Sequence, residues 1–326
     1  MAWPIFLVAA VAIFFAGNTI ARSGDVIARQ TRLGHLWVGA LLIAGATSLP
    51  ELTAGTVAVL RNAPDLAVGG SFGSNMANMA ILAVIALWFG RARVLQHEAR
   101  GIVMMGVLSL VLTGIASLFI ITRLEYDIAG VVGYGSIVLA VAGVIGLLWM
   151  RQPVELVVEQ EQEARPARST ALAGATFCAA AAVIFVAASA LVWAAEDIVE
   201  ITGLAESFVG VLMLAIATSL PELAASSAAV RMGSLDLAVG NIYGSNAMNI
   251  GILIWLDSIY TKAPLLETVD ISNAVAGLVA VVLIMIGLTS MVLRVERRRF
   301  PFDPAAALIL IGYTLGLLLT WSVSSN

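Results

Sequence analysis

The residues of this 326-residue chain best suited to chemistry are two glutamates in identical surroundings. Glu51 lies in the run Ala-Thr-Ser-Leu-Pro-Glu-Leu at 46–52, and Glu222 lies in the same seven residues at 217–223. Each copy places a carboxylate and a proline in the middle of a long apolar stretch. A carboxylate inside a membrane span is energetically expensive, so it indicates a functional site by default.

Small oxygen-bearing side chains accompany both glutamates at helical spacing. Thr47 precedes Glu51 by four residues and Thr218 precedes Glu222 by four, so each pair shares one helical face. A serine follows each threonine, and the next apolar stretch carries a serine and an asparagine four residues apart. These side chains are Ser48, Ser74 and Asn78 in the first copy and Ser219, Ser245 and Asn249 in the second. An isolated residue of this kind usually bonds a neighbouring helix, but repetition around two carboxylates predicts ligands.

The prolines add backbone oxygens to this set. Pro50 and Pro221 have no N–H to donate to the carbonyl four residues earlier, so we expect both helices to break there. Irregular backbone inside a membrane is tolerated where it is buried or lines a cavity. Carboxylates, amide oxygens, hydroxyls and carbonyls suit a hard cation such as Ca²⁺, and the lack of His and Cys nearby disfavours soft metals. Two carboxylates neutralise one Ca²⁺ or two Na⁺.

Two purely structural explanations for the glutamates compete with a cation site. A buried ion pair would need Lys or Arg inside a span, and none is placed there by the spans predicted below. A permanently protonated, hydrogen-bonded glutamate is the other, and the presence of the carboxylate in both copies argues against it.

The two copies belong to a longer internal repeat with an offset of 171 residues. Residues 44–82 and 215–253 align without a gap and share 22 of 39 residues. We therefore expect two related halves, residues 1–150 and 169–326. A glutamate-rich cytoplasmic linker at 151–168 would join them.

The composition predicts a polytopic membrane protein. Hydrophobic residues make up 60% of the chain and charged residues 12%, against about 25% charged in soluble domains. Apolar stretches of about 20 residues are long enough to cross a bilayer, and we count ten. They are Trp3–Ala21, His35–Leu60, Leu66–Phe89, Gly101–Ile121, Asp127–Met150, Ser169–Ala195, Phe208–Val230, Leu237–Trp255, Ile271–Leu293 and Pro304–Trp321. The first is expected to continue as a helix towards Ala28.

The distribution of basic residues supports this count. With ten spans, the loops on one side hold 14 of the 17 Lys and Arg residues, which makes that side cytoplasmic. Both termini would then be extracytoplasmic, in a multi-pass protein of the cell (inner) membrane. Because each half would have five spans, an odd number, the second half would enter the membrane in the opposite orientation to the first. The predicted fold class is an all-α membrane protein with ten transmembrane helices in two inverted five-helix repeats, with helices 2 and 7 broken.

The repeated motifs resemble those of a known family. ATSLPEL followed by LAVGGSFGSNMANM, with ATSLPEL and LAVGNIYGSNAMNI in the second half, is similar to the alpha-repeats of the sodium/calcium exchanger family, of prokaryotic type. The resemblance covers the whole chain. It implies alternating access, with Na⁺ and Ca²⁺ competing at one central site and the long first and sixth spans sliding as gates. Glu51 and Glu222 would be the main ligands, helped by the hydroxyl and amide side chains named above. The carbonyls of Ala44 and Ala215 match positions that bind Na⁺ in the family.

Two features of the motifs differ from many relatives. Ala46 and Ala217 stand where many have Gly, which leaves the ligand chemistry alone. Asn249 stands where some relatives, including the potassium-dependent branch, carry Asp. Relatives with this motif exchange three Na⁺ for one Ca²⁺, and the neutral Asn249 predicts exchange that does not require K⁺.

Three other functions remain open at this stage. Proton/calcium exchange on the same fold is the main alternative, although relatives of that kind tend to carry a GNAPE-like sequence in place of TSLPE. A symporter for an organic solute would need apolar or aromatic residues around the carboxylates. An intramembrane enzyme would need a nucleophile–base pair or a metal motif, and none is recognisable. Besides the transported ions and the lipid bilayer, the sequence indicates no cofactor, nucleic acid or obligatory protein partner.

Overall fold

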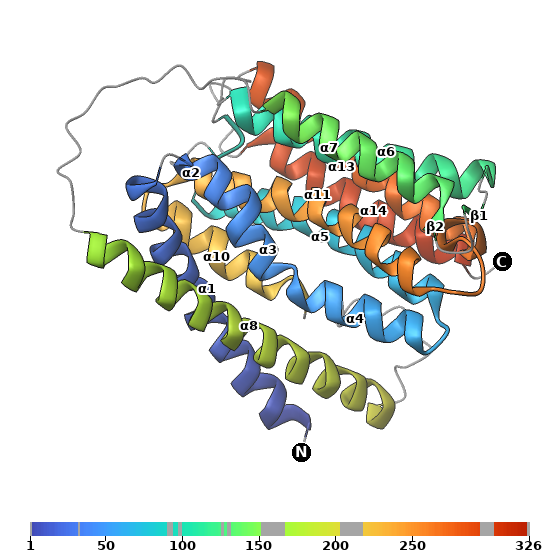
Figure 1. Cartoon of the computed structure of the whole chain (residues 1–326), viewed down its shortest axis with the longest axis horizontal. Helices are drawn as coiled ribbons and strands as arrows, with labels where there is room; N and C mark the ends of the chain where they lie inside the picture. The colour runs from blue at the N-terminus through green and yellow to red at the C-terminus, as the bar shows by residue number, and fades with distance from the viewer. Residues whose placement is uncertain are drawn as a thin grey trace.

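In the computed structural model, the described part of the chain is almost entirely helical (Figure 1). The structure describes residues 2–31, 33–89, 94–96, 100–124, 127–128, 132–150, 167–202, 218–293 and 303–324. The predicted linker at 151–168 therefore lies outside the described residues except for its last two. Residues 215–217 of the second motif also lie outside the described residues.

The first half begins with a long helix and continues through an interrupted one. Its elements are α1 (Ala2–Gln30), α2 (Gly34–Trp37), the π-helix η1 (Val38–Ile43), α3 (Ala44–Thr47), α4 (Leu49–Leu60), α5 (Pro64–Trp88), the 3₁₀ turn η3 (Val94–Gln96), α6 (Arg100–Thr122), β1 (Asp127–Ile128), β2 (Val132–Gly133) and α7 (Tyr134–Met150). The expected extension of the first span towards Ala28 is confirmed, since α1 ends at Gln30.

The second half also starts with a long helix. Its elements are α8 (Ala167–Thr202), α10 (Leu220–Arg231), α11 (Leu235–Ile259), α12 (Leu265–Thr268), α13 (Ile271–Leu293) and α14 (Pro304–Ser324). The predicted span Phe208–Val230 is described only from Thr218 onward.

The described helices are those of a multi-pass membrane protein. Six of them are long and apolar enough to cross a bilayer, and α2 to α4 form a seventh candidate that is bent by 43°. Helix α7 is apolar but shorter, with 17 residues. The full count of ten spans and their inverted arrangement stay predictions.

The fifth predicted span was placed too early in the chain. It was expected to begin at Asp127, but the helix begins at Tyr134 and the residues before it contribute to a short antiparallel pair, Asp127 opposite Gly133 and Ile128 opposite Val132. The backbone N–H of Gly133 donates to the carboxylate of Asp257 at 2.7 Å, and that of Leu265 donates to the same carboxylate at 2.7 Å. This buried carboxylate fixes the backbone there in a non-helical conformation.

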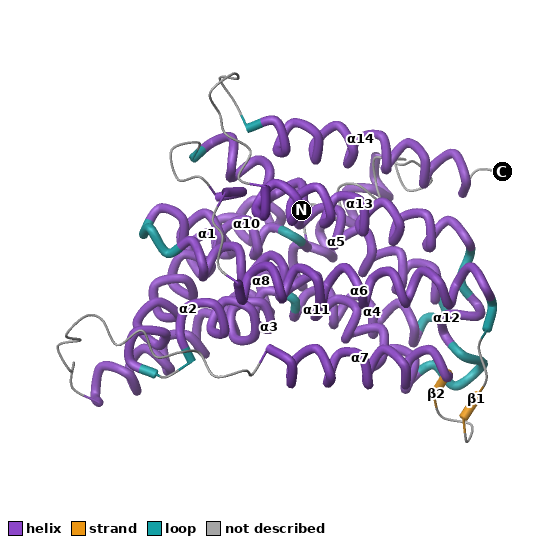
Figure 2. Tube along the Cα trace, turned by 90° about the horizontal axis from the view of Figure 1, so that it is seen from above, coloured by secondary structure: helices purple, strands orange, loops and turns teal. Residues whose placement is uncertain are grey.

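Helices of both halves surround α5 and α11, which carry the Ser-Asn parts of the two motifs. α6 packs against α11 of the other half, and α13 packs against α5. α7 and α14 lie on opposite sides of the bundle (Figure 2). α1 and α8 lie together along another side (Figure 1), and parts of both pack in two small apolar clusters separate from the main core.

Small residues bring α11 close to η1. A methyl group at Gly39 would meet the carbonyl oxygen of Leu237 at 2.5 Å, and one at Gly244 would overlap the backbone of Ala40. The close approach places the backbone that leads into the first motif directly against the helix that carries the second.

Candidate cation site

Both motifs interrupt a helix just before their proline. In the first, α3 ends at Thr47, Ser48 has φ −87° and ψ 5°, and α4 starts at Leu49. In the second, Ser219 has φ −89° and ψ 1°, and α10 starts at Leu220. Because proline lacks an N–H and suits the first turn of a helix, each proline starts a new helix. The break expected in the first motif is confirmed, and the described part of the second has the same geometry.

The breaks place both glutamates in the first turn of a helix. There the backbone N–H groups have no partner within the helix, and the helix dipole favours a negative charge. The side chains of Glu51 and Glu222 are buried, with 7% and 1% exposed. Neither forms an ion pair with a basic residue in the described part of the chain.

Hydroxyl groups donate to both carboxylates, and one of these bonds crosses between the halves. Ser48 of the first motif donates to Glu222 Oε1 at 3.5 Å, and Ser245 donates to the same oxygen at 3.3 Å. Ser74 donates to Glu51 Oε1 at 3.3 Å. The carboxylate of the second half is therefore reached from the first half, and the two motifs meet at one place.

Thr47 extends this group of oxygens. Its hydroxyl oxygen lies 3.3 Å from the carbonyl oxygen of Ala44, 3.3 Å from Asn241 Oδ1 and 3.5 Å from Ser245 Oγ. The Ala44 carbonyl also accepts the N–H of Ser48 at 2.9 Å, so one of its lone pairs is already used.

The spacing of these oxygens is wider than that of strong hydrogen bonds. O–H···O bonds are usually about 2.7–2.8 Å long, and Thr56 and Thr113 bond carbonyls of their own helices at 2.7 Å. Oxygens placed octahedrally at about 2.4 Å around Ca²⁺ would be about 3.4 Å from one another. Distances of 3.3–3.5 Å are therefore compatible with ligands that share a cation. They do not single out the site, because the Ser71 hydroxyl lies at the same 3.3 Å from the Ala67 carbonyl of its own helix.

Several buried oxygens around the carboxylates have no hydrogen-bond partner among the described residues. They are Glu51 Oε2, Glu222 Oε2, Asn78 Oδ1, Asn249 Oδ1 and Ser219 Oγ. Buried polar atoms are nearly always paired, so five unpaired oxygens in one region call for a ligand that accepts their lone pairs. In the described residues, no three His, Cys, Asp or Glu side chains cluster, which leaves two carboxylates and neutral oxygens as the donors.

The structure brings most of the predicted site residues together. Hydrogen-bond contacts join five of them, Ala44, Thr47, Ser48, Glu222 and Ser245, and a separate contact joins Ser74 to Glu51. Asn78, Ser219 and Asn249 are buried and contribute unpaired oxygens. Thr218 is buried beside the second break. Ala215 lies outside the described residues.

Sequence reasoning missed three asparagines of this region. Asn241 contacts Thr47 and donates from Nδ2 to Ser226 Oγ at 2.9 Å. It lies four residues before Ser245, on the same helical face, but the first copy has Gly70 at the matching position, so a search for repeated residues passes over it. Asn75 and Asn246 could have been found, because both copies contain them.

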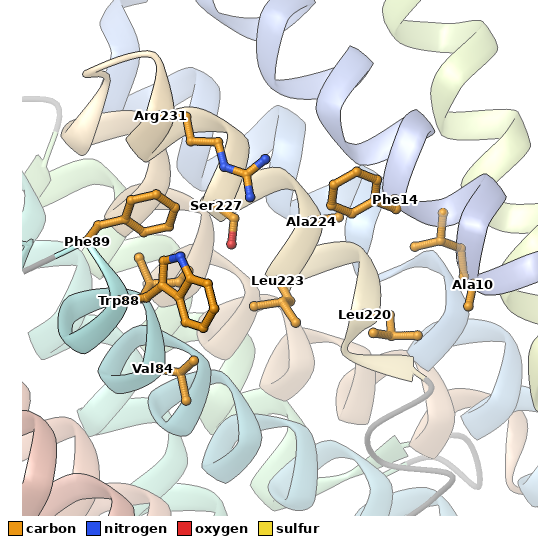
Figure 3. Close-up of a pocket in the computed structure, with 12 residues that line it drawn as sticks. Ala10, Phe14, Val84, Trp88, Phe89, Leu220, Leu223, Ala224, Ser227 and Arg231 are labelled. Atoms are coloured by element: carbon orange, nitrogen blue, oxygen red, sulfur yellow. The ribbon is translucent and has the colours of Figure 1, made fainter. Parts of the chain in front are cut away.

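A separate groove lies between α1, α5 and α10 (Figure 3). It has a volume of about 240 Å³, and its walls are apolar apart from Ser227 and Arg231. The guanidinium of Arg231 lies over the ring of Phe89, 5.8 Å from its centre. With no carboxylate among its lining residues, this groove lacks the donors that a divalent cation needs.

Comparisons with known proteins agree with this fold. The family model described as sodium/calcium exchanger protein matches residues 1–128 and 172–269. The inner membrane protein YrbG of Escherichia coli is 27% identical over 281 residues, covering 80% of each chain. The sodium/calcium exchanger MaX1 of Methanosarcina acetivorans is 36% identical over 61 residues, 19% of this chain and 17% of its own. A solved structure of the sodium-calcium exchanger NCX_Mj superposes with a TM-score of 0.73 at 20% identity, covering 97% of this chain and 98% of that one, so the two share a fold.

Proposed function

This chain belongs to the sodium/calcium exchanger family, and we propose that it is a secondary active antiporter that exchanges Na⁺ for Ca²⁺ by alternating access. The exchange takes place at one central site between Glu51 and Glu222. The observation that carries the proposal is the set of unpaired buried oxygens around these two carboxylates, each of which also has a hydroxyl group within 3.5 Å.

The proposed ligands divide into charged and neutral groups. Glu51 and Glu222 supply the two negative charges. The amide oxygens of Asn78 and Asn249 and the neighbouring hydroxyls supply neutral donors, and the carbonyls of Ala44 and Ala215 complete the set. These hydroxyls belong to Thr47, Ser48, Ser74, Thr218, Ser219 and Ser245.

The same charges explain why ion movements would be coupled. An empty site leaves two carboxylates in a buried environment without a counter-ion, which costs several kcal/mol per charge. A bound Ca²⁺ or a set of Na⁺ ions removes that penalty. The protein therefore switches readily between its two conformations, each of which opens the site to one side of the membrane, when a cation is bound, and rarely when the site is empty. A cation that leaves on one side is then exchanged for one that enters on the other.

The neutral Asn249 sets the charge of each loaded state. With both glutamates ionised, the empty site carries −2, one Ca²⁺ brings it to zero, and three Na⁺ bring it to +1. The third Na⁺ is held by hydroxyls and the Ala44 carbonyl without a further carboxylate. Each cycle then moves one net charge, worth about 2.3 kcal/mol per 100 mV of membrane potential.

A flux assay in proteoliposomes tests the proposal. Vesicles loaded with Na⁺ are given external tracer Ca²⁺, with the membrane potential clamped by an ionophore and K⁺ removed in a second series. We expect uptake that needs internal Na⁺ and that persists without K⁺. Because three Na⁺ leave for each Ca²⁺ that enters, one net positive charge leaves per cycle, so uptake should speed up when the vesicle interior is made positive. Uptake driven only by a proton gradient and indifferent to voltage would identify a proton/calcium exchanger and overturn the sodium coupling.

A further inference from the structure

Four buried asparagines form a crossed network between α5 and α11. Asn78 donates from Nδ2 to Asn246 Oδ1 at 3.0 Å, and Asn249 donates from Nδ2 to Asn75 Oδ1 at 3.0 Å. Asn75 in turn donates from Nδ2 to the backbone carbonyl of Asn246 at 3.2 Å. Each of these side chains is at most 1% exposed.

The bonds fix which end of each amide is free. In Asn78 and Asn249 the NH₂ group is held by the asparagine of the opposite half. Their carbonyl oxygens are left buried without a hydrogen-bond partner in the described part of the structure. An amide that rotated by half a turn would point its NH₂ group at the cation, where a donor repels instead of binding.

We propose that Asn75 and Asn246 are positioning residues, each of which holds the liganding asparagine of the other half with its oxygen towards the cation. This inference rests on the proposed ligand role of Asn78 and Asn249. It assigns a part to two residues that form no hydrogen bond with either carboxylate among the described residues, and it makes each half of the site depend on the opposite half.

The two positioning residues are held unequally. Asn75 Nδ2 also donates to Thr113 Oγ1 on α6 at 3.2 Å, so both ends of its amide are fixed. Asn246 Nδ2 has no partner among the described residues, and the residue 171 positions after Thr113 is Ile284, which has no polar atom to offer. Asn246 therefore orients Asn78 through a single bond, which makes it the cleaner position for a test.

The test measures equilibrium binding of tracer Ca²⁺ to the purified full-length protein. Asn246→Leu keeps the side chain's size but removes the acceptor for Asn78, and we expect Ca²⁺ binding to weaken about tenfold. Asn246→Asp keeps an acceptor oxygen and should bind within about threefold of the wild type. Equal loss in both variants would overturn the proposal, since the orienting bond is then not what matters.

A double-mutant cycle separates positioning from a general effect on folding. If Asn246 acts through Asn78, Asn246→Leu should add no further loss in a protein that already carries Asn78→Ala. Asn75 bonds Asn249, so Asn75→Leu should cause no further loss of Ca²⁺ binding in a protein that already carries Asn249→Ala. In a protein that carries Asn78→Ala instead, Asn75→Leu should still weaken Ca²⁺ binding. Additive losses in the matched pairs would contradict the crossed arrangement.

A control variant and the choice of binding as the readout distinguish a failure of the positioning role from a failure of the proposed function. Ser71→Ala changes a buried hydroxyl on α5 that bonds only its own helix, at Ala67 O, and should leave binding unchanged. Binding does not depend on which ion drives transport. A wild type that binds no Ca²⁺ would defeat the proposed function itself, whereas a wild type that binds and an Asn246→Leu variant of equal affinity would defeat only the positioning role.

Discussion

The two copies of the motif share their ligand residues but differ in what surrounds them. Glu222 is 1% exposed and accepts hydroxyl bonds from Ser48 and Ser245, whereas Glu51 is 7% exposed and accepts one, from Ser74. On the side of Glu222, the oxygen group continues through Thr47 to Asn241.

The extra contacts come from positions where the copies are not identical. Asn241 and Ser226, which bond each other, correspond to Gly70 and Gly55 in the first copy. A glycine offers no side-chain oxygen, so the first copy has no counterpart of this polar pair. Identical residues thus supply the same donors twice, and the residues that differ make the two sides of the site unequal.

The largest expected effect concerns what the copies share. Glu51→Gln or Glu222→Gln removes one of the two charges that balance a divalent ion in a buried site, at a cost of several kcal/mol. We expect Ca²⁺ flux near background for either variant, because the cation needs both halves. Tracer uptake in proteoliposomes measures this, with membrane insertion checked separately.

Asp197→Asn provides the matched control for charge. Its carboxylate is exposed on α8, and flux should be unchanged. Normal flux in one of the two glutamate variants would show that a single half suffices, and the shared site would have to be abandoned.

A smaller effect is expected where the copies differ. Asn241→Gly gives the second copy the residue of the first and removes a partner of Thr47. One hydrogen bond contributes about 0.5–1.5 kcal/mol, so we expect roughly two- to tenfold weaker competition of Na⁺ against Ca²⁺ binding. Ser226→Ala, which removes only the group that holds Asn241, should give part of this loss. Unchanged competition in both variants would mean that the inequality of the two sides has no effect on ion binding.

The smallest effect lies in the core and concerns stability alone. Tyr243 is fully buried, its hydroxyl has no partner among the described residues, and the matching residue of the first copy is Phe72. Because an unpaired buried hydroxyl costs about 1–3 kcal/mol, Tyr243→Phe should raise the melting temperature and leave flux unchanged. Phe72→Tyr should lower the melting temperature. A thermal melt of the detergent-purified protein would contradict this account if Tyr243→Phe unfolded earlier than the wild type.

Repetition explains how much of the site could be read from the sequence. Ser74 and Ser245 stand out because they occupy the same place in both copies, each four residues before an asparagine. The apolar stretches locate most of the helices. Asn241 has no counterpart, so repetition could not reveal it. The late start of α7 depends on Asp257, more than 120 residues away, which captures the N–H of Gly133. The π-helical turn at Val38–Ile43 likewise has no local signal and lies where the backbone meets α11.

The crossed asparagines also bear on how the chain is made. Asn75 and Asn78 are synthesised 171 and 168 residues before Asn246, the residue that each of them bonds. At roughly 5–20 residues per second, the first half waits on the order of 10–35 s inside the membrane before its amide groups can meet those bonds. During that time its polar face needs water, lipid headgroups or the insertion machinery as a substitute. The nascent first half is therefore an incomplete folding unit, and its assembly is completed by the second half rather than on its own.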